Sequence, residues 1–454
     1  MKYLIPDEII TLYKAIQNAG FEVYLIGGCV RNLLLERKVK DWDLTTNATP
    51  EQIQEIFPDS YYDNSYGTVG VPIKKDEEVV TIVEITTFRT EGGYKNFRHP
   101  ESVSWGKTLI EDVTRRDFTV NSLAIEIKDD EQILIDLTNG KKDLDKRIIR
   151  AVGNPDERFQ EDALRMLRAI RFATQLEFTI EEKTWKAIKK NNQLISRISY
   201  ERIREELLKI LASDFPYEGV MLLDNVGILE IILPELTRGK GISQKRPGRH
   251  HKDDVFTHNV LSLKYCPSSD PLVRFATLLH DVGKPDVASI DESGYVIFYN
   301  HEVVGSRIAK NIADRFHFSK KEREKIYTLI RWHMFTIDEN ITDSAIRRFI
   351  RRVGIENVAD MIDLRIGDRL GGGTQVAESW RLKKFKERLS EQLNPPFSIN
   401  DLAIDGNDIM KELNIPPGRE VGKILQVLFE EVDEDLSKND RNFLLSRIRA
   451  LKEK

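Results

Sequence analysis

The distribution of apolar and polar residues changes near residue 155. Before that point, short helical stretches are mixed with five β-like runs, which predict strands at 23–28, 67–75, 79–88, 122–127 and 132–137. After Pro155, apolar residues recur every three or four positions, as in RFQEDALRMLRAIRFATQLEF and YERIREELLKILAS. This spacing predicts helices with few strands. The pattern therefore predicts an α+β head followed by helical modules.

The length of the chain predicts several domains. At 454 residues it is too long for a single core. A stretch rich in Gly, Pro, Lys and Arg at 236–249 is typical of a linker, as is the region of Asn394, Pro395 and Pro396. We expect four parts, at 1–150, 151–236, 250–390 and 391–454.

The chain lacks the sequence features of a membrane or secreted protein. No apolar run approaches the roughly 18 to 20 residues of a membrane span, and the first residues, MKYLIPDEII, do not resemble a secretory signal. The two cysteines, Cys29 and Cys266, cannot form a disulfide framework. We therefore expect a cytoplasmic protein.

Positive charge is concentrated locally although the net charge is -5. Residues 141–210 contain 17 Lys and Arg against 12 Asp and Glu, and residues 236–252 contain six Lys or Arg and no acidic residue. Binding to a polyanion depends on such patches rather than on the total charge. The segment 236–252 is equally consistent with a solvated loop.

The most informative segment for chemistry is LIGGCVRNLLLERKVKDWDLTT. It predicts a strand that ends at Gly27 and Gly28, followed by a helix that begins near Val30, so that backbone N–H groups can approach a triphosphate. Asp41 and Asp43 are two residues apart, which on a strand places both carboxylates on one face. Two such carboxylates can hold Mg²⁺ ions between a nucleoside triphosphate and an attacking hydroxyl.

The order of these features resembles the polymerase-β-type nucleotidyltransferases. In particular, the chain resembles the bacterial class II tRNA nucleotidyltransferase and poly(A) polymerase family, in its long form with an HD domain. Five further segments match family motifs in the same order: VEITTFRTEGGYKNFRHPESV, RRDFTVNSLA, DLTNGKKDLDKRIIRAVGNP, RFQEDALRMLRAIRFA and ERIREELLKIL. The resemblance covers about 190 residues and implies a head with a small mixed sheet, a helical neck and body, an HD-type helical domain and a helical tail.

The resemblance assigns roles to individual residues. It implies catalytic roles for Asp41, Asp43 and Glu84, the last of which is followed by the family's flexible loop. It also implies a nucleotide-binding set: Gly27, Gly28, Arg31, Arg116, Asp117, Asn121, Glu161, Asp162, Arg165 and Arg168. Two positions depart from the family, which usually has an aspartate at Asn32 and a glycine at Lys141. Because neither is a predicted metal ligand, we expect altered contacts around the site rather than lost chemistry.

The EDxxR segment predicts how the protein selects bases without a nucleic-acid template. On one helix, Glu161, Asp162 and Arg165 would span about 100°, opposite an apolar stripe formed by Ala163, Met166, Leu167 and Ile170. An ionised Asp only accepts hydrogen bonds and an Arg only donates them. Cytosine and adenine each offer an amine donor and a ring-nitrogen acceptor, whereas uracil and guanine present the inverted pattern. We therefore expect Asp162 and Arg165 to select CTP and ATP.

A second group of residues predicts a metal site. His258, His280, Asp281 and Asp368 match the H…HD…D pattern of the HD superfamily, whose metal-dependent members hydrolyse phosphate esters, and four of the chain's eight histidines occupy HD-like positions. Imidazole and carboxylate together suit a divalent transition metal such as Mn²⁺, Ni²⁺ or Co²⁺. His301 and His333 could complete a second metal position. The pattern leaves open whether this module hydrolyses phosphate esters or serves as a scaffold that binds tRNA.

The expected activity is template-independent addition of CCA to the 3′ end of tRNA from CTP and ATP, with Mg²⁺ and release of pyrophosphate. Within the family, an A-only enzyme or a poly(A) polymerase remains an alternative, whereas the retained loop at 91–100 argues against a CC-only enzyme. Outside it, the chain could be an HD phosphohydrolase with a non-catalytic RNA-binding head, or a non-catalytic tRNA-binding protein. The intact Asp41 and Asp43 argue against the first of these, and the second would require both acidic sites to have arisen by accident.

Overall fold

The chain forms two compact units, residues 1–237 and 238–454. The structure is a computed structural model and describes residues 3–63, 67–75, 78–95, 99–129, 131–244, 253–335, 341–374, 376–392 and 398–452; for residues 63, 90–95, 99–104 and 452 it describes the backbone alone. Residues 245–252 of the predicted basic run at 236–252, and the predicted linker around Asn394, Pro395 and Pro396, lie outside these residues. Among the described helices, none combines the length and apolar character that a membrane crossing requires.

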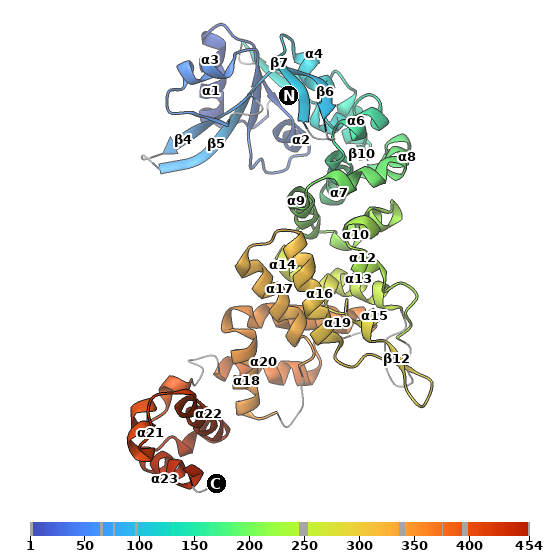
Figure 1. The fold of residues 1–454 in the computed structure, drawn as a ribbon. Coiled ribbons are helices and arrows are strands. Elements are labelled where there is room, and N and C mark those ends of the chain that lie inside the picture. The colour runs from blue at the N-terminus through green and yellow to red at the C-terminus, as the bar shows by residue number, and fades with distance from the viewer. Residues whose placement is uncertain are drawn as a thin grey trace. The chain divides into compact units, whose positions relative to one another are not determined.

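The first unit begins with a seven-stranded mixed sheet (Figure 1). Its strands, in spatial order, are β3 (Tyr61–Asp63), β4 (Thr68–Lys75), β5 (Glu78–Thr87), β2 (Asp43–Thr46), β1 (Val23–Ile26), β8 (Ala124–Lys128) and β9 (Glu131–Ile135). All five predicted runs are strands of this sheet. Only β2 and β5 pair in parallel, and the other neighbours are antiparallel.

Short helices complete the head. They are α1 (Asp7–Asn18), α2 (Gly28–Leu34), α3 (Pro50–Ile56), α4 (Leu109–Thr114), the 3₁₀ turn η1 (Thr119–Asn121) and α5 (Gly140–Asp145). In Figure 1, α1 and α3 lie on one side of the sheet. The buried Tyr13 of α1 links two strands, because its hydroxyl donates to the carbonyl of Val23 and accepts from the amide of Ile127.

The segment predicted as a flexible loop after Glu84 has a regular backbone. It forms an antiparallel hairpin of β6 (Arg89–Lys95) and β7 (His99–Trp105), and residues 96–98 between the strands are outside the described part.

The rest of the first unit is mainly helical, as predicted. Its helices are α6 (Pro155–Glu161), α7 (Leu164–Leu176), α8 (Glu182–Asn191), η2 (Asn192–Arg197), α9 (Tyr200–Leu211), α10 (Pro216–Asn225), α11 (Ile228–Ile232) and α12 (Pro234–Thr237). The two-residue strands β10 (Ile148–Ile149) and β11 (Thr179–Ile180) pair in parallel. Helix α7 buries ten of its thirteen residues, so it forms the core around which α9 and α10 pack.

The second unit contains only helices and one minor hairpin among its described residues. The first group is α13 (Val255–Tyr265), α14 (Pro271–Leu279), α15 (Lys284–Val287), β12 (Ser289–Ile290), β13 (Val296–Ile297), α16 (His301–Arg315), α17 (Lys320–Trp332), α18 (Asp343–Val353), η3 (Ile355–Asn357), α19 (Val358–Gly371) and α20 (Trp380–Gln392). The tail has its own apolar core and consists of η4 (Ile399–Asp401), α21 (Gly406–Leu413), α22 (Arg419–Glu434), η5 (Leu436–Lys438) and α23 (Arg441–Lys452). The predicted α+β fold class is confirmed.

Candidate active sites

A glycine turn joins β1 to α2 at the predicted nucleotide site. Gly27 has a φ of +83°, which side chains strongly disfavour, and its N–H donates to the carbonyl of Leu123. A Cβ placed on Gly27 would lie 3.1 Å from the Nη1 of Arg116 and 3.6 Å from the Oδ2 of Asp43. The helix begins at Gly28, two residues earlier than the sequence predicted. A side chain at position 27 would therefore both strain the backbone and crowd the site.

The three predicted catalytic carboxylates lie at one end of the β2–β5 pair. Asp43 is the first residue of β2 and stands in register with Glu84 of β5. Asp41 precedes the strand, so the prediction that a strand carries both aspartates is only half right. The ladder nevertheless extends back to Trp42, whose carbonyl accepts from the amide of Glu84. Asp41 and Glu84 are exposed, whereas Asp43 is partly buried.

Asp43 has an unusual electrostatic environment. Burial raises its pKa to about 6, and the nearby carboxylates of Glu84 and Asp41 act in the same direction. The guanidinium of Arg116 partly opposes this rise. Such a concentration of negative charge attracts a divalent cation, which would relieve the repulsion.

A buried hydrogen-bond network lies next to the carboxylates. Asp117 accepts from the Nε of Arg168 at 2.7 Å, from the amide of Phe118 at 2.8 Å and from the Nδ2 of Asn121 at 3.4 Å. Burial tends to raise the pKa of Asp117, but Arg168 outweighs that effect and holds the pKa below its usual value. The Oδ1 of Asn121 in turn accepts from Arg31. Four predicted nucleotide-binding residues are thus joined in one network.

Arg116 belongs to a different ion pair. Its Nη2 lies 2.9 Å from the Oδ2 of Asp112, which is fully buried, and Arg115 pairs with the same carboxylate. Because Arg116 also lies within reach of Gly27, Asp112 fixes a cation beside the glycine turn.

The departure from the family at Asn32 has a visible consequence. The Oδ1 of Asn32 accepts from the Nη2 of Arg31 at 3.0 Å and from its Nε at 3.2 Å. Burial lowers the pKa of Arg31 to about 10. An aspartate at position 32 would form a charged pair with Arg31, whereas the asparagine supplies only a neutral acceptor.

The sequence did not predict the arginine cluster around Phe172. The guanidinium carbons of Arg31, Arg168 and Arg171 lie 5.3, 5.4 and 4.3 Å from the centre of its ring. Arg171 also pairs with the buried Glu206 of α9 at 3.0 Å. The RAIRF spacing was the available signal, since it places two arginines beside an aromatic residue within one helical turn.

The EDxxR segment does not form one helix, so that prediction is wrong. Helix α6 ends at Glu161, and Asp162 has an extended backbone with φ −139° and ψ 105°. The Oδ1 of Asp162 then accepts from the amide of Leu164 at 3.0 Å, at the start of α7. An aspartate that satisfies an N-terminal amide in this way favours a new helix start over continuation of the first helix.

The two residues predicted to select bases have separate partners. The carboxylate of Asp162 pairs with Arg202 of α9 at 2.8 Å. The Nη1 of Arg165 pairs with Glu161 at 2.6 Å, and its Nη2 donates to the carbonyl of Arg115 at 3.1 Å. Arg202 therefore holds Asp162 in place, and Glu161 holds Arg165.

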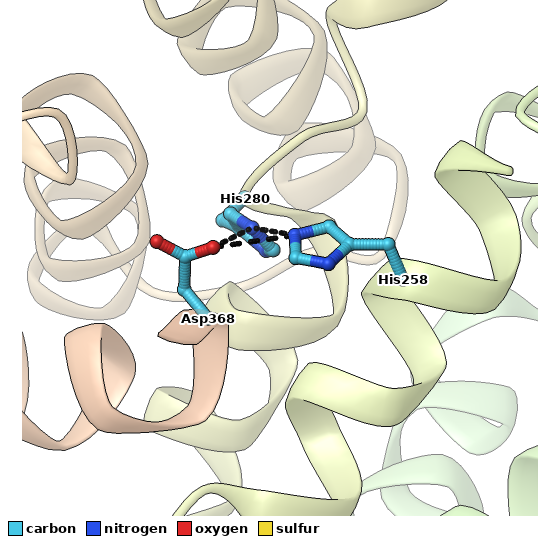
Figure 2. A group of neighbouring side chains, drawn as sticks. All are labelled: His258, His280 and Asp368. Carbon is cyan, nitrogen blue, oxygen red and sulfur yellow. Dashed lines mark hydrogen bonds and ion pairs between the residues drawn. The ribbon is translucent and has the colours of Figure 1, made fainter. Parts of the chain in front are cut away.

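The second unit brings the predicted HD residues together. His258 lies in α13, His280 and Asp281 follow α14, and Asp368 lies in α19. Figure 2 shows His258, His280 and Asp368 pointing towards one another. The Nε2 of His258 lies 3.1 Å from the Nε2 of His280 and 3.3 Å from the Oδ1 of Asp368. These three residues offer ligand atoms within 4.8 Å of one another and could hold one metal ion.

A second such group adjoins the first through Asp281. The Oδ1 of Asp281 lies 3.2 Å from the Nε2 of His301 and 3.6 Å from that of His333. Its Oδ2 lies 3.2 Å from the Nε2 of His258 and 3.3 Å from that of His280. Asp281 therefore faces both groups and could bridge two metal ions.

Backbone contacts orient three of these histidines. The Nδ1 atoms of His280, His301 and His333 lie 2.8, 2.8 and 2.7 Å from the carbonyl oxygens of Thr277, Phe298 and Ile330. Each Nδ1 therefore donates to a carbonyl, which directs the Nε2 of the same ring towards the carboxylates; loss of the Nε2 proton would free its lone pair for a metal ion. The donor set fits divalent metal ions.

Cations that the sequence did not single out surround the cluster. Burial tends to raise the pKa of Asp281, but Lys284, at 2.5 Å, and His280 hold it well below the usual value. Arg365 lies 2.8 Å from the Oδ2 of Asp368. A cavity of about 390 Å³ adjoins the cluster, and both Lys284 and Arg365 line it. A metal-bound phosphate ester in this cavity would meet two positive side chains.

Family models match three segments of the chain. Residues 23–150 match the poly(A) polymerase head domain, residues 177–239 match a probable RNA and SrmB-binding site of polymerase A, and residues 260–366 match the HD domain. Both the nucleotidyltransferase and the HD families are metal-dependent.

Curated relatives extend the match to the whole chain. A CCA-adding enzyme from Ligilactobacillus salivarius is 46% identical over 460 residues, covering 99% of this chain and 98% of the relative. One from Lactobacillus helveticus is 48% identical, but that alignment covers 45% of this chain, which spans about half the length of the relative it matches. One from Lactobacillus gasseri is 32% identical over 94% of this chain and 93% of its own.

Solved structures share the fold. The CCA-adding enzyme of Bacillus stearothermophilus in complex with CTP has a TM-score of 0.74 at 24% identity, over 99% of this chain and all of the other. The Thermotoga maritima CCA-adding enzyme complexed with tRNA has a TM-score of 0.58 at 20% identity, over 99% of this chain and 97% of the other. At such identities the likeness concerns the fold alone. Taken with the near-complete alignment to the Ligilactobacillus salivarius relative, the three matched domains show that this chain belongs to the family of CCA-adding enzymes.

Proposed function

We propose that this protein adds CCA to the 3′ end of tRNA, with CTP and ATP as substrates and pyrophosphate as the product. The observation that carries the proposal is the meeting of Asp43 and Glu84 across the β2–β5 pair, next to Asp41 and the Gly27 turn. A cytoplasmic location and tRNA as the partner are parts of the same proposal. So is the division into a head (1–150), a neck and body (151–236), an HD domain (250–390) and a tail (391–454).

Asp41 and Asp43 are the proposed ligands of Mg²⁺, with Glu84 as the third acidic residue. When bound there, Mg²⁺ would neutralise the triphosphate and lower the cost of deprotonating the attacking hydroxyl. Positioning of the nucleotide falls to the chain itself. The Gly27 turn leaves space for phosphates, and Arg116, held by Asp112, faces that space.

The network around Asp117 is proposed to read the sugar of the nucleotide. Arg168 fixes the Asp117 carboxylate and Arg31 fixes the side-chain oxygen of Asn121, so neither acceptor needs to reorganise when a ribose arrives. Preorganised polar groups of this kind stabilise a bound ligand at little cost in ordering.

Base selection is proposed for Asp162 and Arg165, flanked by Glu161. Asp162 accepts from the exocyclic amine of cytosine or adenine, and Arg165 donates to the ring nitrogen beside it. Uracil and guanine would leave polar groups unpaired, at a cost of about 1 to 3 kcal/mol each. Arg202 pairs with the Asp162 carboxylate and so orients it for this purpose.

The activity is tested by incubating the purified protein with tRNA that lacks its 3′ CCA, supplying each labelled nucleotide separately. We expect two cytidines from CTP and one adenosine after them. Addition of A only to tRNA that already ends in CC would indicate an A-only enzyme, and an unlimited run of A would indicate a poly(A) polymerase. No addition of any nucleotide would contradict the proposal.

We also propose that the HD cluster hydrolyses phosphate esters with a transition metal such as Mn²⁺, Ni²⁺ or Co²⁺. The bridging position of Asp281 between two histidine groups favours this activity over a purely structural role. Metal ions held there would activate a water molecule, while Lys284 and Arg365 would receive the phosphate. Hydrolysis of phosphodiesters and 2′,3′-cyclic phosphates is measured with each metal in turn. If none is cleaved with any metal, the module is a scaffold.

A further inference from the structure

A second cavity lies beside the HD cavity in the second unit. Its volume is about 610 Å³, and Met334, the residue after His333, lines both cavities. The new cavity has an apolar side that includes the buried residues Phe349, Val353 and Phe385. Arg331, Arg348 and Arg352 line it as well. The cavity thus combines an aromatic surface with several positive charges.

The four arginines of α18 face two different surroundings. Arg347 and Arg351 both pair with the buried carboxylate of Asp433 in α22, at 2.8 and 2.6 Å, so they anchor the tail. Arg348 and Arg352 line the cavity instead. No acidic side chain pairs with either of them in the part of the chain that the structure describes. Within the described residues, the cavity therefore has two positive charges that no acidic side chain pairs with.

An aromatic side chain accompanies these charges. The guanidinium carbons of Arg331 and Arg352 lie 4.2 and 5.0 Å from the ring centre of Trp332, which is only partly buried. Stacked arginine and tryptophan planes are a common surface for the bases of nucleic acids. Among the described residues that line the cavity, Glu302 is the only one with a carboxylate, and it lies 3.8 Å from Arg331.

We propose that this cavity binds a nucleotide unit, with the base against the aromatic side and the phosphate at Arg348 and Arg352. Its volume falls within the range of about 300 to 1,000 Å³ that is typical of pockets for small ligands. Guanidinium groups are well suited to phosphate because they donate two parallel hydrogen bonds. The same chemistry fits a free mononucleotide and the terminal nucleotide of a single-stranded RNA.

The cavity is connected to the metal cluster through shared elements. His301 and His333 face the cluster, and their chain neighbours Glu302 and Trp332 line the cavity. Arg365 donates to Asp368 of the cluster and lies 5.8 Å from the ring centre of Phe335, which lines the cavity. A nucleotide bound here would therefore be positioned beside the HD site. The inference does not depend on CCA addition.

Photolabelling of the full-length protein with 8-azido-AMP, in EDTA and followed by peptide mass spectrometry, tests the site. We expect the label on peptides that contain Trp332 or Phe349, and we expect excess AMP to compete with the probe and reduce this labelling. The double variant Arg348→Glu, Arg352→Glu should lose about tenfold or more of this label, because two charge-assisted phosphate contacts are replaced by repulsion. Arg307→Glu, at an exposed arginine of α16, is the matched control and should label normally.

A second arm uses a single-stranded RNA hexamer with a terminal 4-thiouridine. Labelling of the same peptides by the RNA alone assigns the cavity to a strand end, labelling by 8-azido-AMP alone assigns it to a mononucleotide, and labelling by both probes shows that it binds either. Thermal unfolding checks that the variants fold. The proposal is overturned if neither probe labels these peptides, or if the folded double variant labels them as strongly as the Arg307→Glu control does.

Discussion

The two acidic sites of this chain are assembled in opposite ways. In the head, Asp41 and Glu84 are exposed, and burial raises the pKa of Asp43 to about 6. In the HD cluster, Asp281 and Asp368 are surrounded by histidines and by Lys284 and Arg365. Burial there would raise the pKa of both carboxyl groups, but these neighbours hold it well below the usual value.

The difference indicates which parts each site still needs. The HD ligands already converge within 4.8 Å in each group, and backbone carbonyls orient three of the imidazoles. That site needs only its metal ions. The head presents carboxylates without enough cations to balance them, so we expect it to bind metal together with the triphosphate. The predictions below test this contrast.

The largest effect is expected from the head carboxylates. Asp41→Ala or Asp43→Ala should reduce nucleotide addition at least about a thousandfold, because metal-ion catalysis is worth several kcal/mol and each 1.36 kcal/mol is a factor of ten. Binding of tRNA, measured by gel shift, should remain nearly intact. Glu8→Ala, at an exposed carboxylate of α1, is the control and should keep full activity. Substantial addition by both aspartate variants would exclude this site.

The next effect concerns metal binding by the HD cluster. At 100 times its dissociation constant, a metal that binds only the folded state stabilises it by about 2.7 kcal/mol. We expect Mn²⁺ or Ni²⁺ to raise the midpoint of thermal unfolding of the second unit, and Asp281→Asn to abolish the rise because Asp281 faces both ligand groups. Asp314→Asn, at a surface ion pair of α16, should respond like the unmodified protein. An equal rise in Asp281→Asn would show that the metal binds elsewhere.

Base choice should change by a smaller amount. Replacing Arg165 with alanine removes the proposed donor to cytosine N3 and adenine N1. Discrimination against UTP and GTP should then fall by about 1 to 3 kcal/mol, roughly one to two powers of ten, with slower addition overall. Arg165→Lys keeps the charge but not the planar donor pair, so we expect an intermediate loss. If Arg165→Ala is slower yet keeps its full preference for CTP and ATP, some other surface selects the base.

The smallest effect is on stability and depends on pH. The pKa of Asp43 is higher in the folded protein than in the unfolded chain, so protonation of this carboxyl stabilises the fold. This stabilisation is complete below about pH 4 and is lost as the pH rises through about 6. In metal-free buffer at pH 7.5, Asp43→Asn should therefore unfold with a free energy higher by on the order of 1 kcal/mol. Denaturant titrations at pH 7.5 and pH 4 should show the difference only at the higher pH. If Asp43→Asn and the unmodified protein have the same free energy of unfolding at both pH values, the claim that the head carries unbalanced negative charge is contradicted.

Much of the head could be predicted because its strands carry local signals. The five β-like runs are all strands of the sheet, and the spacing of Asp41 and Asp43 indicated a site at the end of β2. The break at Asp162 could not be predicted in this way. The apolar spacing from Ala163 to Ile170 continues the helical period of α6, so the sequence pattern gives no sign that the helix ends. The break is visible only in the structure, where the amide of Leu164 donates to Asp162.

The HD cluster shows a similar limit. The histidines and aspartates stand out in the sequence because those residue types are uncommon in such spacing. Lys284 and Arg365 do not stand out, since a lysine and an arginine among helices are normally surface charges. Each pairs with an aspartate three residues earlier or later in the chain, but the cavity that both of them line forms only where α15 and α19, distant segments of the chain, meet, and no local pattern records that meeting. The hairpin of β6 and β7 was not predicted, because the family resemblance implied a flexible loop in that segment.

The most direct test of the contrast between the two sites measures incorporation of labelled CTP and ATP into tRNA lacking CCA by two variants, Asp43→Ala and Asp281→Asn. The account predicts that Asp43→Ala adds no nucleotide, while Asp281→Asn adds two cytidines and one adenosine at close to the normal rate. Full activity of Asp43→Ala, or loss of addition in a folded Asp281→Asn protein, would contradict the assignment of nucleotidyl transfer to the head alone.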